Sequence, residues 1–176
     1  YMVLEHLEGT SLRDALQAQT FSPARAMSIG LALAAALRVA HRHKILHRDL
    51  TPGNVFMDGD DRPHILDFGL ARVLEAGAAP LSPETEQDSQ LTTGIQPFEG
   101  TRVGQHGTPA YMSPEQWRGD PVTAAVDIWT LGLLLHEMLT GERPYVDLFG
   151  GPISELGLAV SGPDPVPPLD ASAGVP

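Results

Sequence analysis

The chain has 176 residues, no Cys, 42% hydrophobic residues and a formal charge of −11. The charge argues against a surface for nucleic acid or anionic membrane, because both need clustered cations, and the absence of Cys makes the cytoplasm the default location. The length and hydrophobic content predict one folded domain, and no uninterrupted apolar run reaches the roughly 18 residues that a membrane span needs.

The first twenty residues contain a β-prone segment and a short helix. Residues 1–4 are an apolar run with β propensity, and residues 5–9 are interpreted as a connector. Ser11 followed three residues later by Asp14 is a capping-box pattern, which predicts a short helix over residues 12–17.

A long amphipathic helix and a hairpin follow. Ser22 and Pro23 are an N-cap and a first-turn proline, and apolar residues then recur every three or four positions, so a helix is predicted over residues 24–43. Residues 55–57 and 64–66 are β-prone runs on either side of an Asp-Gly turn signal, which predicts a hairpin.

The second half of the chain contains a loop and a buried helix. Periodicity is lost from about residue 75 to 106, where acidic residues are interleaved with Pro, Gly, Ser and Thr, so we predict a long acidic loop. Residues 124–139 are apolar nearly all round and end at Gly141, which indicates a buried central helix. After Pro152 the chain is rich in Gly and Pro, and its last ten residues carry no helical signal.

Three polar residues flank the predicted hairpin. In the predicted register residue 57 lies opposite residue 64, so Asn54 and Asp67 leave the hairpin side by side, about 5 Å apart between Cα atoms. Asn and Asp oxygens suit Mg²⁺, which takes oxygen ligands from protein, water and phosphates. Asp49 precedes Asn54 across a turn and could accept a proton near that metal. Taken singly, each of the three is more often simply a turn residue.

Several motifs along the chain match one family. Residues 47–54 have the sequence HRDLTPGN and residues 67–69 the sequence DFG, which resemble the catalytic loop and the DFG motif of eukaryotic-like (bacterial-type) serine/threonine protein kinases. Residues 107–115, GTPAYMSPE, are similar to the end of a kinase activation segment. Residues 127–132, DIWTLG, are similar to the central helix of the kinase large lobe.

The resemblance implies an α+β, protein-kinase-like fold, with a mostly helical large C-terminal lobe, a hinge strand and a β-hairpin. Residues 1–8 would be the last small-lobe strand and the hinge, and residues 9–176 an incomplete large lobe with the activation segment at residues 67–115. The Gly-rich loop, the phosphate-contacting strand lysine and its Glu partner would all precede residue 1. The small lobe is therefore expected to be absent from this chain.

For the chemistry, the resemblance implies transfer of the γ-phosphate of ATP to Ser or Thr hydroxyls of a protein substrate. Asp49 would accept the hydroxyl proton, while Asn54 and Asp67 would hold the Mg²⁺ ions that bridge the phosphates. Arg48 would pair with a phosphate on the activation segment. Thr51 stands where the family usually has a Lys that steadies the transferred phosphate, so turnover is expected to be reduced unless the missing lobe compensates.

The nucleotide and the regulatory segment involve five further residues by resemblance. Glu5 and Leu7 would present backbone groups to the adenine, and Phe56 would form the floor of the adenine pocket, although Phe56 is equally explained as a core residue. Thr108 resembles the residue that hydrogen-bonds near the catalytic Asp in kinases acting on Ser or Thr. Thr101 is the best candidate for phosphorylation of the acidic loop, and an unregulated, solvated insertion is an equal alternative.

Three residues would support the site. His47 belongs to the catalytic-loop motif, and Asp127 would brace that loop by accepting backbone N–H groups. Glu115 is expected to be unpaired, because the Arg that normally pairs with it would lie beyond residue 176. His41 and His43 are interpreted as exposed helix-end residues rather than metal ligands, because i, i+2 spacing splays their side chains apart.

Two alternative functions remain open. Thr51 and the missing strand lysine favour a pseudokinase that acts as a binding module. A small-molecule phosphotransferase on the same scaffold is disfavoured by residues 107–115, which resemble a peptide-docking platform. Lys44 is the one lysine of the chain and ends a helix, so it cannot replace either active-site lysine. We therefore predict that the chain by itself binds ATP weakly and transfers little phosphate.

Overall fold

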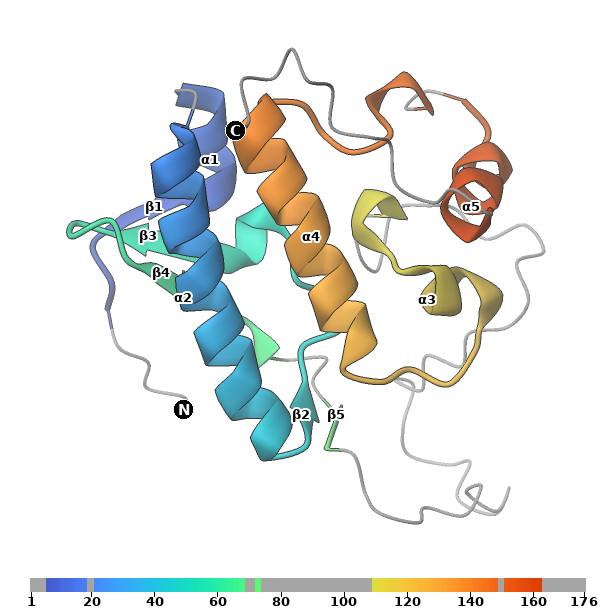
Figure 1. Cartoon of the computed structure of the whole chain (residues 1–176), viewed down its shortest axis with the longest axis horizontal. Coiled ribbons are helices and arrows are strands. Elements are labelled where there is room, and N and C mark those ends of the chain that lie inside the picture. The colour runs from blue at the N-terminus through green and yellow to red at the C-terminus, as the bar shows by residue number, and fades with distance from the viewer. Residues whose placement is uncertain (1–5, 19–20, 69–71, 74–108, 149–150, 163–176) are drawn as a thin grey trace.

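A computed structural model of the chain describes residues 6–18, 21–68, 72–73, 109–148 and 151–162 (Figure 1). These residues form a mostly helical body with small antiparallel sheets, which confirms the predicted fold class. The predicted features that lie outside the described residues are the strand at 1–4, Glu5, the acidic loop at 75–106, Thr101 and Thr108.

Two long helices, α2 (Pro23–Arg42) and α4 (Ala125–Thr140), lie side by side in the centre of the molecule (Figure 1). Both were expected from their sequence patterns. The Ser22 side chain caps α2 by accepting a hydrogen bond from the Arg25 N–H at 3.2 Å. Helix α4 ends at Gly141, whose φ of 75° is the left-handed conformation of a helix C-cap.

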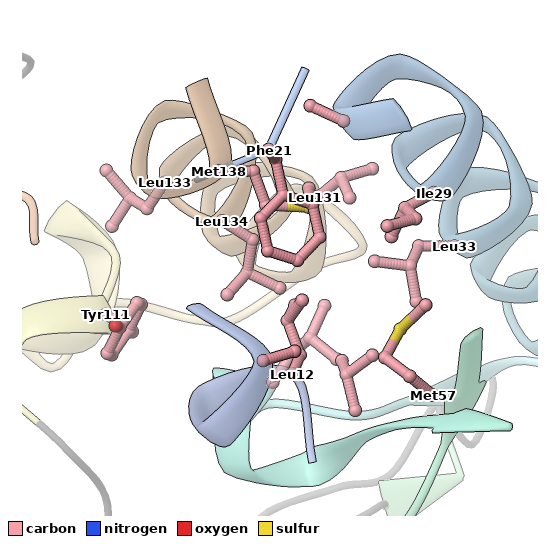
Figure 2. Close-up of a cluster of buried hydrophobic side chains, with 14 of the residues drawn as sticks. Leu12, Phe21, Ile29, Leu33, Met57, Tyr111, Leu131, Leu133, Leu134 and Met138 are labelled. Carbon is pink, nitrogen blue, oxygen red and sulfur yellow. The ribbon is translucent and has the colours of Figure 1, made fainter. Parts of the chain in front are cut away.

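The hydrophobic core lies between α2, α4, the short helix α1 (Leu12–Ala18) and the neighbouring strands (Figure 2). The two long helices come close at Gly30, where a Cβ atom would lie 2.6 Å from the Leu135 side chain. Burial of this apolar surface is the main force that fixes the polar loop residues packed around it. Figure 2 labels Leu12, Phe21, Ile29, Leu33, Met57, Tyr111, Leu131, Leu133, Leu134 and Met138 of this cluster.

Two small antiparallel sheets lie next to the predicted site. The first has the strand order β1-β3-β4, with β1 at Gly9–Ser11, β3 at Val55–Asp58 and β4 at Pro63–Ile65. In the second sheet, β2 (Ile45–Leu46) pairs with β5 (Arg72–Val73). The connection from β2 to β3 contains the catalytic-loop sequence, so both ends of that loop are fixed by strands.

Strand β1 was not predicted, because its residues were interpreted as the end of a connector and the start of a helix. Gly9 has a φ of 154°, and a Cβ atom there would lie only 1.9 Å from the Met57 carbonyl oxygen. Only glycine permits so close an approach of two backbones. Glycine contributes no β propensity, so the sequence pattern gave no strand signal at this position.

The hairpin is confirmed, but its register differs by one residue from the prediction. Met57 pairs with Pro63 and not with His64. The cause is the turn, in which Asp61 is left-handed with a φ of 62° and its N–H donates to the Asp58 carbonyl at 3.0 Å. A left-handed residue at the end of a tight loop makes a bulge, which shifts the pairing relative to a symmetric turn.

Two further helices, α3 (Pro114–Arg118) and α5 (Ile153–Ser161), pack against each other and were not predicted. A Cβ atom at Gly157 of α5 would lie 3.0 Å from the Trp117 ring, so the small residue permits the contact. In α5 the buried residues are Leu156 and Val160, a spacing of one helical turn that would have indicated a helix. The short 3-10 helices are η1 (Pro52–Asn54), η3 (Pro109–Tyr111) and η4 (Val146–Leu148).

Helix α2 also has the length and hydropathy of a membrane-spanning helix, the one case in the described part of the chain. Its sequence also contains Arg25 and Arg38. Its buried residues Ile29, Leu33 and Leu37 belong to the hydrophobic core. The core therefore explains the apolar character of α2 on the side that faces α4.

Candidate active site

The catalytic-loop sequence begins at His47, whose side chain is fully buried. Its Nδ1 lies 3.3 Å from the Asp49 backbone nitrogen and its Nε2 2.8 Å from the Leu66 carbonyl oxygen. A backbone N–H can only donate, so Nδ1 is the acceptor and Nε2 carries the proton that is donated to Leu66. The ring also contacts Phe68 edge-on, with 4.9 Å between the ring centres. His47 thus connects the catalytic loop to the DFG sequence.

Asp127, at the start of α4, is buried and faces the same loop. Its Oδ1 accepts a hydrogen bond from the Arg48 N–H at 2.8 Å, and its Oδ2 accepts one from the His47 N–H at 3.0 Å. A buried carboxylate is stable only when donors satisfy its oxygens. Helix α4 therefore fixes the backbone of the two residues that precede Asp49.

His41 occupies a different environment from the one that we predicted. Its Nε2 lies 2.7 Å from Asp127 Oδ2, and only 16% of its side chain is exposed. The interpretation of His41 as an exposed helix-end residue is therefore wrong, because the last turn of α2 faces α4. His43, two residues later, is exposed as expected. No local pattern pairs residues that are 86 positions apart, as His41 and Asp127 are.

Arg48 has a backbone conformation that non-glycine residues rarely adopt, with a φ of 69°. Such a conformation costs on the order of 1 kcal/mol and persists only where the surroundings hold it. Here the Arg48 N–H donates to Asp127, and the Arg48 carbonyl accepts a hydrogen bond from Gln116 Nε2 at 3.0 Å. The sequence analysis did not single out Gln116.

Asp49 and Asn54 lie at the two ends of the loop turn. Asn54 Nδ2 donates to the Asp49 carbonyl at 2.7 Å, which orients the amide and leaves its oxygen available to a ligand. Burial raises the pKa of Asp49 above that of an ordinary aspartate, against smaller opposing effects of His47 and of a hydrogen bond from Asn54. Thr51 is buried between them and has a hydroxyl but no charge.

Asn54 and Asp67 lie at the same end of the hairpin, although not directly opposite each other. The Asn54 carbonyl accepts the Leu66 N–H at 2.8 Å, so Asp67 is the next residue along and the predicted pairing of 54 with 67 is wrong. Asp67 is exposed, with a φ of 53°. The Asn54 amide oxygen and the Asp67 carboxylate are hard oxygen donors of the kind that Mg²⁺ takes, so the residues present fit that ion.

Two of the predicted adenine-contacting residues lie in the described part of the chain. Phe56 is half-buried in β3, between Val55 and Met57, which point into the core. Because side chains alternate along a strand, Phe56 lies on the opposite face of the sheet and is not part of the hydrophobic core. Leu7, just before β1, is also half-buried.

The segment from η3 to α3 is attached to α4 by polar groups that the sequence analysis did not assign. The Tyr111 hydroxyl donates to the buried Glu137 carboxylate, and the Thr130 hydroxyl donates to the Tyr111 carbonyl at 3.2 Å. Burial, together with the bond to Glu137, raises the pKa of Tyr111. Glu137 interrupts an otherwise apolar helix, and a carboxylate in such a place signals a buried hydrogen-bond partner.

Glu115 lies beside an open cavity of about 550 Å³ between α3 and α4. Among the described residues no ion pair of its carboxylate is found. The lining residues are Pro114, Glu115, Ala125, Ile128, Trp129, Gly132 and Leu133.

His47 of the catalytic-loop sequence thus contacts Phe68 of the DFG sequence, and Asp127 of α4 holds the loop. Over residues 1–151 the chain matches the protein kinase domain family. The chain belongs to this family. The match ends after η4 and before α5.

Relatives of this chain include several proteins named serine/threonine-protein kinases. Serine/threonine-protein kinase PknB of Mycolicibacterium smegmatis is 34% identical over 176 residues, which cover 99% of this chain and 25% of the relative. PknB of Mycobacterium tuberculosis is 32% identical with the same coverage. Serine/threonine-protein kinase PknD of Mycobacterium tuberculosis is 37% identical over 146 residues, which cover 82% of the chain and 19% of the relative. The chain thus spans about a quarter of the length of these two PknB relatives and a smaller share of the PknD relative.

Proposed function

We propose that the chain is the large-lobe part of a serine/threonine protein kinase, which transfers the γ-phosphate of ATP to Ser or Thr hydroxyls of proteins. The observation that carries the proposal is the position of Asp49, in a loop whose backbone is held by Asp127 of α4. Serine/threonine-protein kinase relatives that cover 99% of the chain support the substrate class.

In this proposal Asp49 accepts the proton of the substrate hydroxyl. Burial raises the pKa of Asp49, while His47 and the hydrogen bond from Asn54 oppose this effect, and Asp49 acts as a base only in its ionised form. Asn54 and Asp67 hold Mg²⁺, which when bound neutralises charge on the phosphates. Thr51 is buried in the same loop and has a hydroxyl but no charge. The negative charge of the transferred phosphate therefore has no cationic partner at residue 51.

The remaining assignments extend the proposal to the nucleotide and to regulation. In this proposal residues 1–8 correspond to the last small-lobe strand and the hinge, and residues 9–176 to an incomplete large lobe. Glu5 and Leu7 present backbone groups to the adenine, and Phe56 forms the floor of the adenine pocket. The position of Phe56 on the sheet face away from the core supports this role. Thr108 would hydrogen-bond near Asp49, as the corresponding residue does in kinases that act on Ser or Thr.

Regulation would act through the activation segment. Phosphorylated Thr101 pairs with Arg48, whose backbone is already fixed by α4. Asp127, His47 and Glu115 support the site without contacting the substrate. We place this part of the protein in the cytoplasm, because the chain contains no Cys for the disulfides that oxidising compartments favour. Parts of the full-length protein outside this chain could anchor it to a membrane.

The proposal is tested by phosphoryl transfer from ATP to a Ser/Thr peptide, with the full-length protein that contains this chain. We expect transfer by the wild type and its loss in Asp49→Asn. Asp60→Asn, at an exposed site on the hairpin turn, is the matched control and should retain activity. ATP binding without any transfer would instead indicate a pseudokinase, and transfer to sugars but not to peptides would indicate a small-molecule phosphotransferase.

A further inference from the structure

We propose that Gln116 is a positioning residue for the proposed kinase reaction, because it fixes the peptide group that leads into Asp49. The inference rests on the proposed function. It adds a direct connection between α3, at the end of the activation segment, and the catalytic loop. The two residues that it joins, Gln116 and Arg48, are 68 positions apart in the sequence.

Both ends of the Gln116 amide are used. Its Nε2 donates to the Arg48 carbonyl at 3.0 Å. Its Oε1 accepts hydrogen bonds from the Ser113 backbone N–H at 2.9 Å and from the Ser113 hydroxyl at 3.1 Å. Because the amide is planar, the bonds to Ser113 at the N-cap of α3 set the direction in which Nε2 points. Gln116 is therefore preorganised to hold the Arg48 carbonyl.

The Arg48 backbone is held from two sides. Its N–H donates to Asp127 Oδ1 at 2.8 Å and its carbonyl accepts from Gln116, while its φ is 69°. A non-glycine residue in this conformation relaxes when the surrounding bonds are lost. Relaxation at Arg48 would rotate the next peptide group, which carries the backbone nitrogen of Asp49. Gln116 thus affects the orientation of Asp49 without contacting the substrate.

The bond from Gln116 completes a set of contacts among three segments. Helix α4 holds the catalytic loop through Asp127, and it holds the η3 segment through Thr130, whose hydroxyl donates to the Tyr111 carbonyl at 3.2 Å. Gln116 adds the direct contact between the α3 segment and the catalytic loop. A change in the position of α3 would therefore reach Asp49 directly through Gln116, in addition to the indirect connection through α4.

The decisive variant is Gln116→Glu in the full-length protein. A Glu side chain keeps an oxygen for the Ser113 N–H and hydroxyl, but it replaces the donor to Arg48 by a second oxygen that repels the carbonyl. Gln116→Ala removes the donor without adding a charge. Gln17→Glu, at an exposed position of α1, is the control for the same chemical exchange elsewhere.

We expect kcat for peptide phosphorylation to fall about tenfold to a hundredfold in both Gln116 variants, because small displacements of a reacting group have effects of this size. The KM for ATP should stay at the wild-type value, because Gln116 bonds to Ser113 and Arg48, and neither is proposed to contact the nucleotide. Gln17→Glu should match the wild type in both parameters. A purely structural role would lower the melting temperature and the active fraction, but it would not lower kcat per folded molecule.

Wild-type kcat in a folded Gln116→Glu variant would overturn the inference. If that variant does not fold, Gln116→Ala decides, and wild-type kcat in Gln116→Ala would overturn it equally. A wild-type protein that transfers no phosphate to the peptide would instead contradict the proposed function, so the two failures are distinguishable.

Discussion

Burial raises the pKa of Asp49 above that of an ordinary aspartate. In the proposed reaction only ionised Asp49 accepts a proton, so activity is lost as the pH falls through this raised pKa. We expect the acidic limb of the kcat–pH profile to lie above about 3.9, the ordinary aspartate value. The measurement is peptide phosphorylation by the full-length protein over the acidic range in which it stays folded.

The control for this profile is Asp60→Asn, which removes an exposed carboxylate and should leave the acidic limb unchanged. Circular dichroism at each pH separates loss of the base from loss of the fold. An acidic limb at or below the ordinary aspartate value would show that burial of Asp49 does not govern the reaction.

Asp127 is the residue whose replacement should cost most stability near the site. Its two oxygens accept three hydrogen bonds, from His41, His47 and Arg48. Asp127→Asn places an NH₂ group against these donors, so we expect the free energy of unfolding to fall by about 2–4 kcal/mol. Urea denaturation measures this change.

The matched exchange is Asp120→Asn on the surface, where Asp120 pairs with Arg118 and 49% of its side chain is exposed. Exposed ion pairs contribute about 0–1 kcal/mol, so this variant should lose much less stability than Asp127→Asn. Equal losses of unfolding free energy in the two variants would show that the buried hydrogen bonds to the catalytic loop stabilise the protein no more than an exposed ion pair does.

At the scale of elements, the contact between α2 and α4 organises the molecule. Leu33 lies fully buried on α2 in the core, whereas Leu31 on the same helix is 67% exposed. We expect Leu33→Ala to lower the free energy of unfolding by about 2–5 kcal/mol, because it removes buried methyl groups and leaves a cavity. Leu31→Ala should change it by about 0.5 kcal/mol or less.

The two leucine variants share one chemical change and one helix, so helix propensity affects them alike. Chemical denaturation of the chain by itself, or of the full-length protein, measures both. A loss at Leu31 as large as that at Leu33 would mean that the outer face of α2 is also packed in the protein that is measured.

At the scale of the whole molecule, the chain contains one lysine, Lys44, which is exposed just beyond the end of α2. Kinases use a strand lysine and usually a catalytic-loop lysine to contact the phosphates, and in the proposed assignment Thr51 stands at the second position. We therefore expect the 176-residue chain, expressed alone, to bind ATP weakly and to transfer little or no phosphate.

Isothermal titration with ATP and Mg²⁺, together with a phosphoryl-transfer assay, tests this expectation against the full-length protein. The chain by itself should show weaker binding and much lower kcat. Robust transfer by the purified 176-residue chain would overturn the view that phosphate contacts from outside it are needed.

Local features of the fold could be predicted from the sequence. The start of α2 follows from Ser22 and Pro23, the end of α4 from Gly141, and the hairpin from two β-prone runs around a turn. The motif that contains Asp49 and Asn54 is also local. These features depend on residues within a few positions of one another, so one-dimensional patterns are sufficient to find them.

The sequence by itself therefore determined the family, the long helices and the candidate residues for catalysis and metal binding. Only the tertiary structure decided the hairpin register, the partner of His41 and the connection of Gln116 to Arg48. Hydrogen bonds to Asp127 and Arg48 join residues 68 to 86 positions apart, and the register depends on one left-handed residue in a turn. Such contacts form only when helices and loops pack, because their geometry is set by the core and not by neighbouring residues.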